Sequence, residues 1–344
     1  MIDPYHKPVA PRCNPSFGES QRVLWCCMKD SFLLSGPVRE VTIRRVKGSF
    51  ESEDKDFLAA EEPLEIRVEG HSVAIVMRTP GEDRELAAGF LVTEGLVHNA
   101  NDIVDIAYRT HCLNRERDGS ARRSKVNEAV PTEAAFRTAP NLSLSEGNVI
   151  NVSLREPESL DLKKLTRHVF TSSSCGICSK ASIEAVRQQF PPVEDHCTVE
   201  PEVLMELPQA LASAQETFKR TGGLHACAVF DLTGKLLVLR EDVGRHNALD
   251  KVVGWGLLGN RLPLHKHILL LSGRTSFEMM QKALAAGIPI VAAVSAPSSL
   301  AAEFARDSGQ TLVGFLRGER MNIYAGGDRV SRLESSLEVS TTET

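Results

Sequence analysis

Apolar residues in the second half of the chain follow two alternating spacings. Short, almost continuous apolar runs are typical of strands buried on both faces, and longer segments with apolar residues three or four positions apart are typical of helices. Strands are predicted at residues 224–230, 236–240, 267–271, 288–294 and 311–315, and helices at 179–190, 202–220, 247–258, 275–287 and 298–308. Strands that alternate with helices predict a three-layer α/β domain around a buried sheet.

The first half of the chain is richer in strands. Residues 38–46 alternate apolar and charged side chains, which is the period of a strand with one buried face. Further strands are predicted at 64–68, 73–77 and 149–154. A helix is predicted at 83–95, where Gly95 is a suitable stop. The fold class is therefore α/β with a β-rich N-terminal portion, and we expect one domain over residues 37–330.

Three segments lack periodicity. Residues 1–36 hold several Pro and Ser, and we expect them to form a disordered N-terminal extension. Residues 110–146 are rich in Arg, Asn, Ser and Pro, which predicts a long surface insertion. Residues 331–344 are expected to be a disordered tail.

The composition is that of a globular protein, since apolar residues make up 42% of the 344 residues and the formal net charge is -5. That charge argues against a nucleic-acid scaffold. No apolar run is long enough to span a bilayer and the N-terminus has no signal pattern, so we expect a cytoplasmic protein that binds neither nucleic acid nor membranes. The eight cysteines are scattered through the chain, which argues against a disulfide framework.

The strongest local signal is the sequence Thr-Ser-Ser-Ser-Cys-Gly-Ile-Cys-Ser-Lys at residues 171–180. It leads into a predicted helix, so Cys175 lies at or just before a helix N-terminus. Unpaired backbone N–H groups there, together with Lys180, lower the pKa of a thiol. Gly176 allows a bulky partner to approach the sulfur. These features suit a nucleophilic thiolate.

The C-x-x-C pair of Cys175 and Cys178 is also compatible with half of a structural zinc site or with a dithiol redox motif. A closed zinc site needs two further ligands, and none of the candidates forms a second C-x-x-C pair. Those candidates are His196, Cys197, His225 and Cys227. On the motif alone, zinc binding, redox chemistry and sulfur transfer all stay open.

Two polar segments flank predicted strands. His225 follows a glycine turn, where its imidazole could act as a general acid or base, pair with a thiolate at Cys175, or be a hydrogen-bonded structural histidine. The run 240–251 places charged and histidine side chains around Gly244, where a strand turns into a helix. Loops at such strand ends build sites in α/β proteins, so we favour a site there over a solvated helix start.

Two further turns are candidates for binding anions. Residues 272–274 (Ser-Gly-Arg) precede a predicted helix and form a cradle suited to pyrophosphate, although Thr275 and Glu278 also fit a structural capping box. Residues 315–320 (Phe-Leu-Arg-Gly-Glu-Arg) follow the last predicted strand. Arginine forks match phosphate groups and guanine edges, and an aromatic ring can stack on a base, but an ordinary hairpin turn fits as well.

Together these segments resemble the formate dehydrogenase accessory sulfurtransferase family (FdhD type). The similarity extends from about residue 38 to residue 324 and rests on motifs that follow one another in order. They are RTPGEDRELAAGFL at 78–91, SSCGIC at 173–178, TGGLH at 221–225, REDVGRHNALDK at 240–251, SGRTSFE at 272–278, AGIP at 286–289 and VSAP at 294–297. The chain departs from the family in its N-terminal extension, in its long insertion and at Ser179, where a glycine is expected.

The resemblance implies a sulfurtransferase with a cysteine persulfide intermediate. Such a protein moves sulfur from a cysteine desulfurase to the molybdenum bis(molybdopterin guanine dinucleotide) cofactor used by formate dehydrogenase. Cys175 would carry the persulfide and Cys178 would assist on a mobile loop over 171–180, in a homodimer with a cytidine-deaminase-like fold. The residues expected to bind the cofactor are His225, Ser272, Gly273, Arg274, Phe315, Leu316, Arg317, Gly318, Glu319 and Arg320. The desulfurase and the formate dehydrogenase apoenzyme are the expected partners, and no structural metal is expected.

Two other functions are compatible with the sequence. One is a non-catalytic cofactor chaperone, in which the C-x-x-C pair only steadies a loop. The other is a zinc-dependent deaminase-like hydrolase, which needs an H-x-E run followed by P-C-x-x-C. In this chain Ala226 and Cys227 follow His225, so the glutamate is missing, and the C-x-x-C pair comes first.

Overall fold

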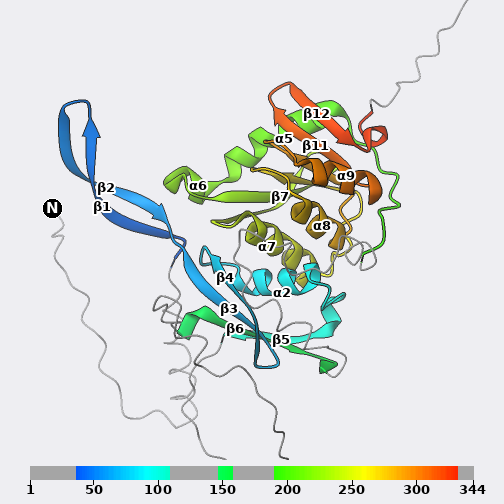
Figure 1. The fold of residues 1–344 in the computed structure, drawn as a ribbon, viewed down its shortest axis with the longest axis horizontal. Helices are drawn as coiled ribbons and strands as arrows, with labels where there is room; N and C mark the ends of the chain where they lie inside the picture. Colours follow the sequence, from blue (N-terminus) through cyan, green and yellow to red (C-terminus); the bar gives the residue numbers. More distant parts are fainter. Residues whose placement is uncertain (1–35, 109–145, 158–189, 332–344) are drawn as a thin grey trace, which may run out of the picture. The chain divides into compact units, whose positions relative to one another are not determined.

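The computed structural model describes residues 36–108, 146–157 and 190–331. Several expectations fall outside these residues: the extension at 1–36, nearly all of the insertion at 110–146, the helix at 179–190, the tail, and the loop that carries Cys175 and Cys178. The described chain is a mixed α/β protein with three sheets and a β-rich N-terminal portion, as predicted (Figure 1). Within it, no helix combines the length and apolar character needed to cross a membrane.

The largest sheet has six strands in the order β12-β11-β10-β9-β7-β8. Its strands are β7 (His225–Asp231), β8 (Leu236–Asp242), β9 (His267–Leu271), β10 (Ile290–Ala293), β11 (Thr311–Arg317) and β12 (Arg320–Ala325). Strands β9, β10 and β11 are parallel, whereas β7, β8 and β12 each run antiparallel to a neighbour. The parallel strands are the short apolar runs of the sequence, because a sheet covered on both faces leaves no strand position for water.

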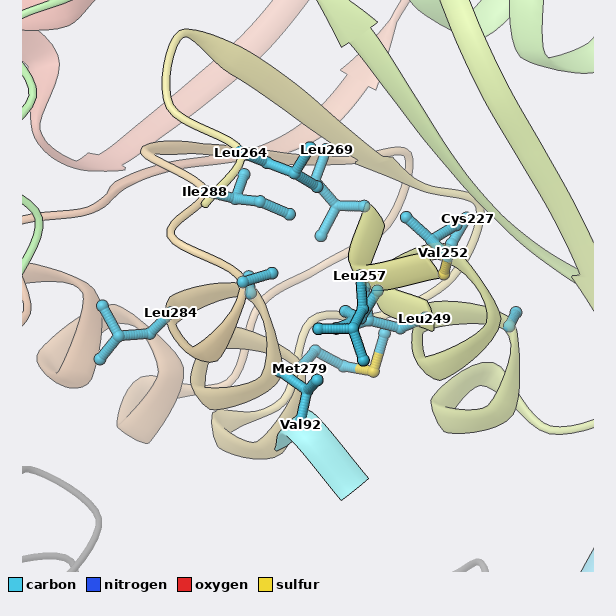
Figure 2. Packing of buried hydrophobic residues seen from close by; sticks show 14 of the residues in the cluster. Val92, Cys227, Leu249, Val252, Leu257, Leu264, Leu269, Met279, Leu284 and Ile288 are labelled. Carbon is cyan, nitrogen blue, oxygen red and sulfur yellow. The ribbon is translucent and has the colours of Figure 1, made fainter. Parts of the chain in front are cut away.

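Side chains of this sheet alternate between two cores. Cys227 and Val229 point into one core, and Ala228 and Phe230, one position along, point into the other. Helices α7 (Arg245–Leu258), α8 (Phe277–Ala285) and α9 (Ser299–Asp307) contribute to the first core, and α5 (Pro201–Ala214) contributes to the second. Figure 2 shows part of the first core, where Cys227, Leu249, Leu269 and Met279 are packed together. The sheet therefore lies between two helical layers, which confirms the predicted three-layer arrangement.

A four-stranded sheet packs on the other side of the first helical layer. Its order is β4-β3-β6-β5, with β3 (Glu62–Val68), β4 (His71–Arg78), β5 (Ile103–Tyr108) and β6 (Val149–Leu154). Helix α2 (Asp83–Thr93) joins it to α7, and residues of this sheet, α2 and α7 share one hydrophobic core. The turn between β3 and β4 has Glu69 and Gly70 in left-handed backbone. Short 3-10 turns lie at Ala100–Asp102, Glu146–Asn148 and Gly327–Arg329.

Helices α2 and α7 cross at backbone contact. A Cβ atom at Gly89 would lie 1.8 Å from the carbonyl oxygen of Asp250, and one at Gly254 would lie 1.9 Å from that of Glu85. Next to the crossing, Lys282 of α8 binds the buried Asp250 carboxylate with Nζ–O distances of 2.8 and 2.9 Å. Glycine at both positions lets the two helices approach this closely.

One predicted helix is wrong in its extent. The segment predicted as a single helix at 202–220 is two helices, α5 and α6 (Glu216–Thr221), because Gln215 leaves helical backbone at φ -77 and ψ 83. The carboxylate of Glu241 accepts hydrogen bonds from the backbone N–H groups of Thr217 and Phe218 at 3.0 and 2.8 Å. A carboxylate that is distant in sequence thus caps the N-terminus of α6.

The sequence patterns missed three strands. The predicted strand at 38–46 is β1 (Val38–Lys47), and it pairs with β2 (Phe50–Ala59) in a separate, largely exposed ribbon. Strand β2 is so rich in acidic residues that it has no apolar alternation to detect. Strands β5 and β12 were also missed, and both are edge strands with several exposed residues.

Candidate functional site

Most of the candidate residues lie along one edge of the six-stranded sheet. Because β9, β10 and β11 are parallel, their carboxyl ends share that edge. Strand β7 runs the opposite way, so its first residue, His225, lies there too, opposite Asp242 at the end of β8. In open α/β sheets this edge is where ligands bind. We call it the carboxyl edge.

His225 stands against the turn that follows β9. A Cβ atom at Gly273 would lie 3.2 Å from Nδ1 of His225, so the missing side chain is what allows the imidazole to lie so close. Ser272 fixes this turn, since its hydroxyl accepts the backbone N–H of Ala226 at 2.8 Å and its own N–H donates to Ala226 at 3.0 Å. The structure therefore brings together His225, Ser272 and Gly273, which are far apart in sequence.

The surroundings of His225 are positively charged. Burial, followed by the charges of Arg245, His246 and Arg274, lowers the pKa of His225 below its usual 6.5, and only Asp242 acts in the opposite direction. A depressed pKa leaves the imidazole neutral at pH 7, which disfavours the predicted pairing as an imidazolium with a thiolate. Neither Arg245 nor Arg274 forms an ion pair within the part of the chain that is described. This edge of the sheet therefore favours an anion.

Glu278 is used differently from the sequence prediction. Helix α8 begins at Phe277 with Ser276 as its N-cap, so the expected start near Thr275 and the capping box are wrong. The Glu278 carboxylate instead lies 2.8 Å from Nε2 of His246 at the start of α7. The hydrogen bond to His246 lowers the pKa of Glu278. A contact between two helix starts has thus replaced a local cap.

The charged run at 240–251 divides into structural and site residues. Asp242 is fully buried and lies 2.9 Å from the ammonium group of Lys251, which is also fully buried. Arg240 donates to Glu85 of α2 at 2.7 Å. These pairs hold α7 and α2 to the sheet, whereas Arg245 and His246 face the carboxyl edge. Arg245, His246 and Glu278 are the site residues that sequence reasoning left unassigned; their only signal was a strand end leading into a helix.

The turn at 315–320 is a hairpin between β11 and β12, with Gly318 in left-handed backbone at φ 53. Phe315 has φ 52 and lies within a register shift of the strand pair, and the residue is 41% exposed. Leu316 is fully buried in the second core, which makes it a packing residue of the hairpin. Arg317 donates from Nε to the carbonyl oxygen of Val294 at 2.9 Å, which ties the hairpin to the end of β10. Gly318, Glu319 and Arg320 are exposed.

The two described cysteines are poor nucleophiles. Burial raises the pKa of the Cys197 thiol to about 11, and it raises that of the Cys227 thiol well above its usual range. They belong to different cores on opposite faces of the sheet. Two of the candidate zinc ligands are thereby separated by the sheet. No group of three or more His, Cys, Asp or Glu placed to hold a metal is found among residues 36–108, 146–157 and 190–331.

Comparisons with known proteins identify a family and several relatives of this chain. Residues 59–331 match the FdhD/NarQ family. A protein named sulfur carrier protein FdhD from Streptomyces avermitilis is 48% identical over 294 residues, which are 83% of this chain and 93% of that protein. Its namesake from Mycobacterium tuberculosis is 47% identical over 80% of this chain and 91% of its own length, and that from Saccharolobus solfataricus is 38% identical over 85% and 98%.

A solved structure shares the fold. It is the crystal structure of a candidate formate dehydrogenase accessory protein from Desulfotalea psychrophila, with a TM-score of 0.61 and 23% identity over 86% of this chain and 99% of that one. The family match covers most of the chain, and the relatives are similar over nearly their whole length. The protein therefore belongs to the FdhD/NarQ family.

Proposed function

We propose that this protein is a sulfur carrier that accepts persulfide sulfur from a cysteine desulfurase on Cys175 and transfers it to the molybdenum bis(molybdopterin guanine dinucleotide) cofactor. The sulfurated cofactor is then used by formate dehydrogenase. The relatives named sulfur carrier protein FdhD support the transfer of sulfur. The expected partners are the desulfurase, the formate dehydrogenase apoenzyme and a second copy of this chain.

One observation carries the nucleotide part of the proposal: Phe315 exposes its ring from strained backbone. Left-handed backbone is costly for a bulky residue and is found mainly where a site requires it. Here Phe315 is 41% exposed at the carboxyl edge. An exposed aromatic ring can stack on a nucleobase, and the neighbouring Arg317 and Arg320 supply guanidinium donors that suit guanine or phosphate.

The choice of cysteine follows from thiol chemistry. Sulfur relay needs a thiolate at neutral pH. Burial raises the pKa of the Cys197 and Cys227 thiols, which keeps both of them protonated. Cys175 lies outside the described residues, and its assignment rests on the sequence around it. In the loading step, the Cys175 thiolate attacks the outer sulfur of the donor persulfide. A new S–S bond forms, the S–S bond of the donor breaks, and the donor cysteine leaves as a thiolate.

The proposal is tested by loading the purified protein. After incubation with a cysteine desulfurase and cysteine, intact-mass spectrometry should show the addition of one sulfur atom, and Cys175→Ala should abolish it. Cys197→Ala is the matched control, because that thiol is buried and should not carry sulfur. The Cys175→Ala protein should fold normally and fail to activate formate dehydrogenase.

The same materials separate the rival functions. Full activation of formate dehydrogenase by Cys175→Ala would support the cofactor chaperone and overturn the relay. Stoichiometric zinc in the purified protein would support the hydrolase. Persulfide on Cys175 together with loss of activation in its alanine variant would exclude both.

A further inference from the structure

The ribbon of β1 and β2 is largely uncovered in a single copy of the chain. None of the ten residues in either strand is buried. Near the turn of the ribbon, Val46 is 60% exposed and Phe50 is 80% exposed. At its other end the ribbon packs on α6, where the guanidinium group of Arg220 lies 5.1 Å from the centre of the Phe57 ring. A two-stranded ribbon is marginally stable in water unless another layer covers it, so the rest of this ribbon needs a partner.

The two faces of the ribbon differ, because neighbouring side chains of a strand point to opposite faces. Phe57 belongs to the face toward α6. In the register of the strand pair, the opposite face carries two apolar residues from each strand, which are Val41, Ile43, Phe50 and Leu58. The apolar spacing of β1 predicts a buried face, yet Val41 and Ile43 are only half-buried. We call this side of the ribbon the apolar face, and no described element buries it.

The charges of the ribbon are balanced and largely paired within it. Residues 38–59 contain five basic and five acidic side chains. Ion pairs between the two strands include Arg45 with Asp54 at 2.9 Å and Lys55 with Glu40 at 2.6 Å. A ribbon without net charge has no field that would attract a nucleic acid or an acidic membrane. Recognition of the partner therefore rests on apolar contact with another protein surface.

The apolar face is complementary to itself in one orientation. When two ribbons stack face to face and antiparallel, with Ile43 of each at the centre, residues equally far from Ile43 in the same strand meet. Leu58 then faces Phe50 of the other copy, so apolar side chains meet at both ends of the stack. A parallel stack would instead place Leu58 on Arg39 and Phe50 on Lys47. The antiparallel stack is therefore favoured.

The charges of the apolar face fit the same antiparallel stack. Asp56 makes no ion pair with a described residue, and the stack brings it within reach of Arg45 of the other copy. Arg39 meets Lys47 of the other copy, but Glu62 already binds Arg39 at 2.6 Å. Arg39 and Lys47 are long and exposed, so their charged ends can extend into water. The stack therefore buries no unpaired charge.

We propose that the apolar face of the β1–β2 ribbon packs against the same face of a second copy of this chain. Such a two-fold contact is the commonest kind in homo-oligomers. The ribbon spans 22 residues (38–59), and a standard interface takes about 20–30 residues from each partner. The inference gives a surface to the second copy that is expected under the proposed function, but it does not depend on sulfur transfer. The strands of the ribbon also lie almost wholly before residue 59, where the family match begins.

The test is sedimentation equilibrium of the full-length protein. The natural chain should be a dimer. Phe50→Asp and Leu58→Asp should each raise the dissociation constant of the dimer about tenfold or more, because each places a carboxylate in the apolar contact. Val46→Asp is the matched control, since Val46 is similarly exposed on the other face of the same ribbon and should leave the dissociation constant unchanged. None of the three residues is buried, so circular dichroism should show that all three variants fold normally.

Three outcomes would overturn the inference. The first is a natural protein that stays monomeric up to about 100 μM. The second is a dissociation constant that Phe50→Asp and Leu58→Asp leave unchanged, or that Val46→Asp raises as much as they do. The third is a monomer that binds the cysteine desulfurase through Phe50 and Leu58, which would make another protein the partner of the apolar face.

The ribbon contact and the sulfur relay fail in different ways. If the natural protein is a monomer but the desulfurase still loads sulfur on Cys175, the ribbon contact is wrong and the relay stands. If Phe50→Asp and Leu58→Asp dissociate the dimer as expected but Cys175→Ala still activates formate dehydrogenase, the ribbon contact stands and the relay is wrong.

Discussion

Replacing Gly254 by alanine is expected to force α2 and α7 apart. The added Cβ atom would lie 1.9 Å from the carbonyl oxygen of Glu85 and 2.6 Å from its carbon. Both are backbone atoms in the first turn of α2, so neither can rotate away. Real Cβ atoms essentially never approach closer than 3.0 Å, so the two helices must separate by about 1 Å.

The loss of unfolding free energy follows from the packing contacts that this separation opens. The crossing lies in the larger hydrophobic core, among fully buried residues such as Leu86, Val253 and Leu257. A gap of about 1 Å removes a quarter to a half of the dispersion energy of each contact it opens, and overpacking a core typically costs about 1–3 kcal/mol. A backbone clash places this variant at the upper end, about 3 kcal/mol. Alanine regains about 1 kcal/mol through helix propensity, which leaves a net loss of about 2 kcal/mol.

Urea unfolding followed by circular dichroism measures this difference directly. Gly256→Ala is the matched control in the same helix, because its Cβ would meet side chains rather than backbone. The tight contact is with the end of Leu262, 2.8 Å away, which can move, and Leu264 lies at an ordinary 3.6 Å. We expect Gly256→Ala to stay within about 1 kcal/mol of the natural protein. If the two variants lose the same stability, the backbone crossing does not limit the packing of α7, and the reasoning is refuted.

Three further predictions follow from the site and the core. Lys282→Met should cost about 3–5 kcal/mol in urea unfolding at pH 7, because it leaves the buried Asp250 carboxylate without its cation. The loss should shrink as the pH falls, since burial already raises the pKa of Asp250 and protonation removes the charge; an equal loss at pH 5 and pH 7 would contradict this. His225 has a lowered pKa, so the unfolded chain gains a proton near pH 6.5 before the folded chain does, and stability should fall as the pH drops below 6.5. His225→Gln should flatten that part of the pH profile of unfolding, and an unchanged profile would show that the imidazole is not held in its neutral form. Phe315→Gly should keep or slightly raise thermal stability, because glycine relieves left-handed backbone at an entropic cost of about 1 kcal/mol. The affinity for GDP should fall about tenfold, because the stacking ring is lost. Unchanged GDP affinity would count against a nucleobase at this ring.

The fold was predictable where apolar periodicity is strong. The runs that became β7, β9 and β11 are buried on both faces, so almost every position had to be apolar and the pattern could not be mistaken. Where burial is slight, the pattern disappears. Strand β2 is largely exposed and is defined by its pairing with β1, which is a contact that no local window of sequence contains.

The break between α5 and α6 could not have been predicted for a related reason. The chain around Gln215 has helical spacing on both sides, and the signal for a new helix start is the carboxylate of Glu241, at the end of β8. The capping box at Thr275 failed in the same way. Glu278 has the correct spacing to cap its own helix, but His246 at the start of α7 binds its carboxylate instead. In both cases tertiary contact overrides a local motif.

The sequence predicted which turns contribute to the candidate site. It did not predict which of their charged residues are structural and which are open to a ligand. The run at 240–251 contains charges of similar density throughout, and only the fold divides them. Asp242 and Lys251 face inward and neutralise each other in the core, whereas Arg245 lies at the edge where three parallel strands end and no described carboxylate pairs with it. A charged side chain in this protein is therefore structural or available to a ligand according to whether the fold supplies a counter-charge. That criterion separates Arg245 and Arg274, which form no ion pair with a described residue, from the inward-facing pair of Asp242 and Lys251.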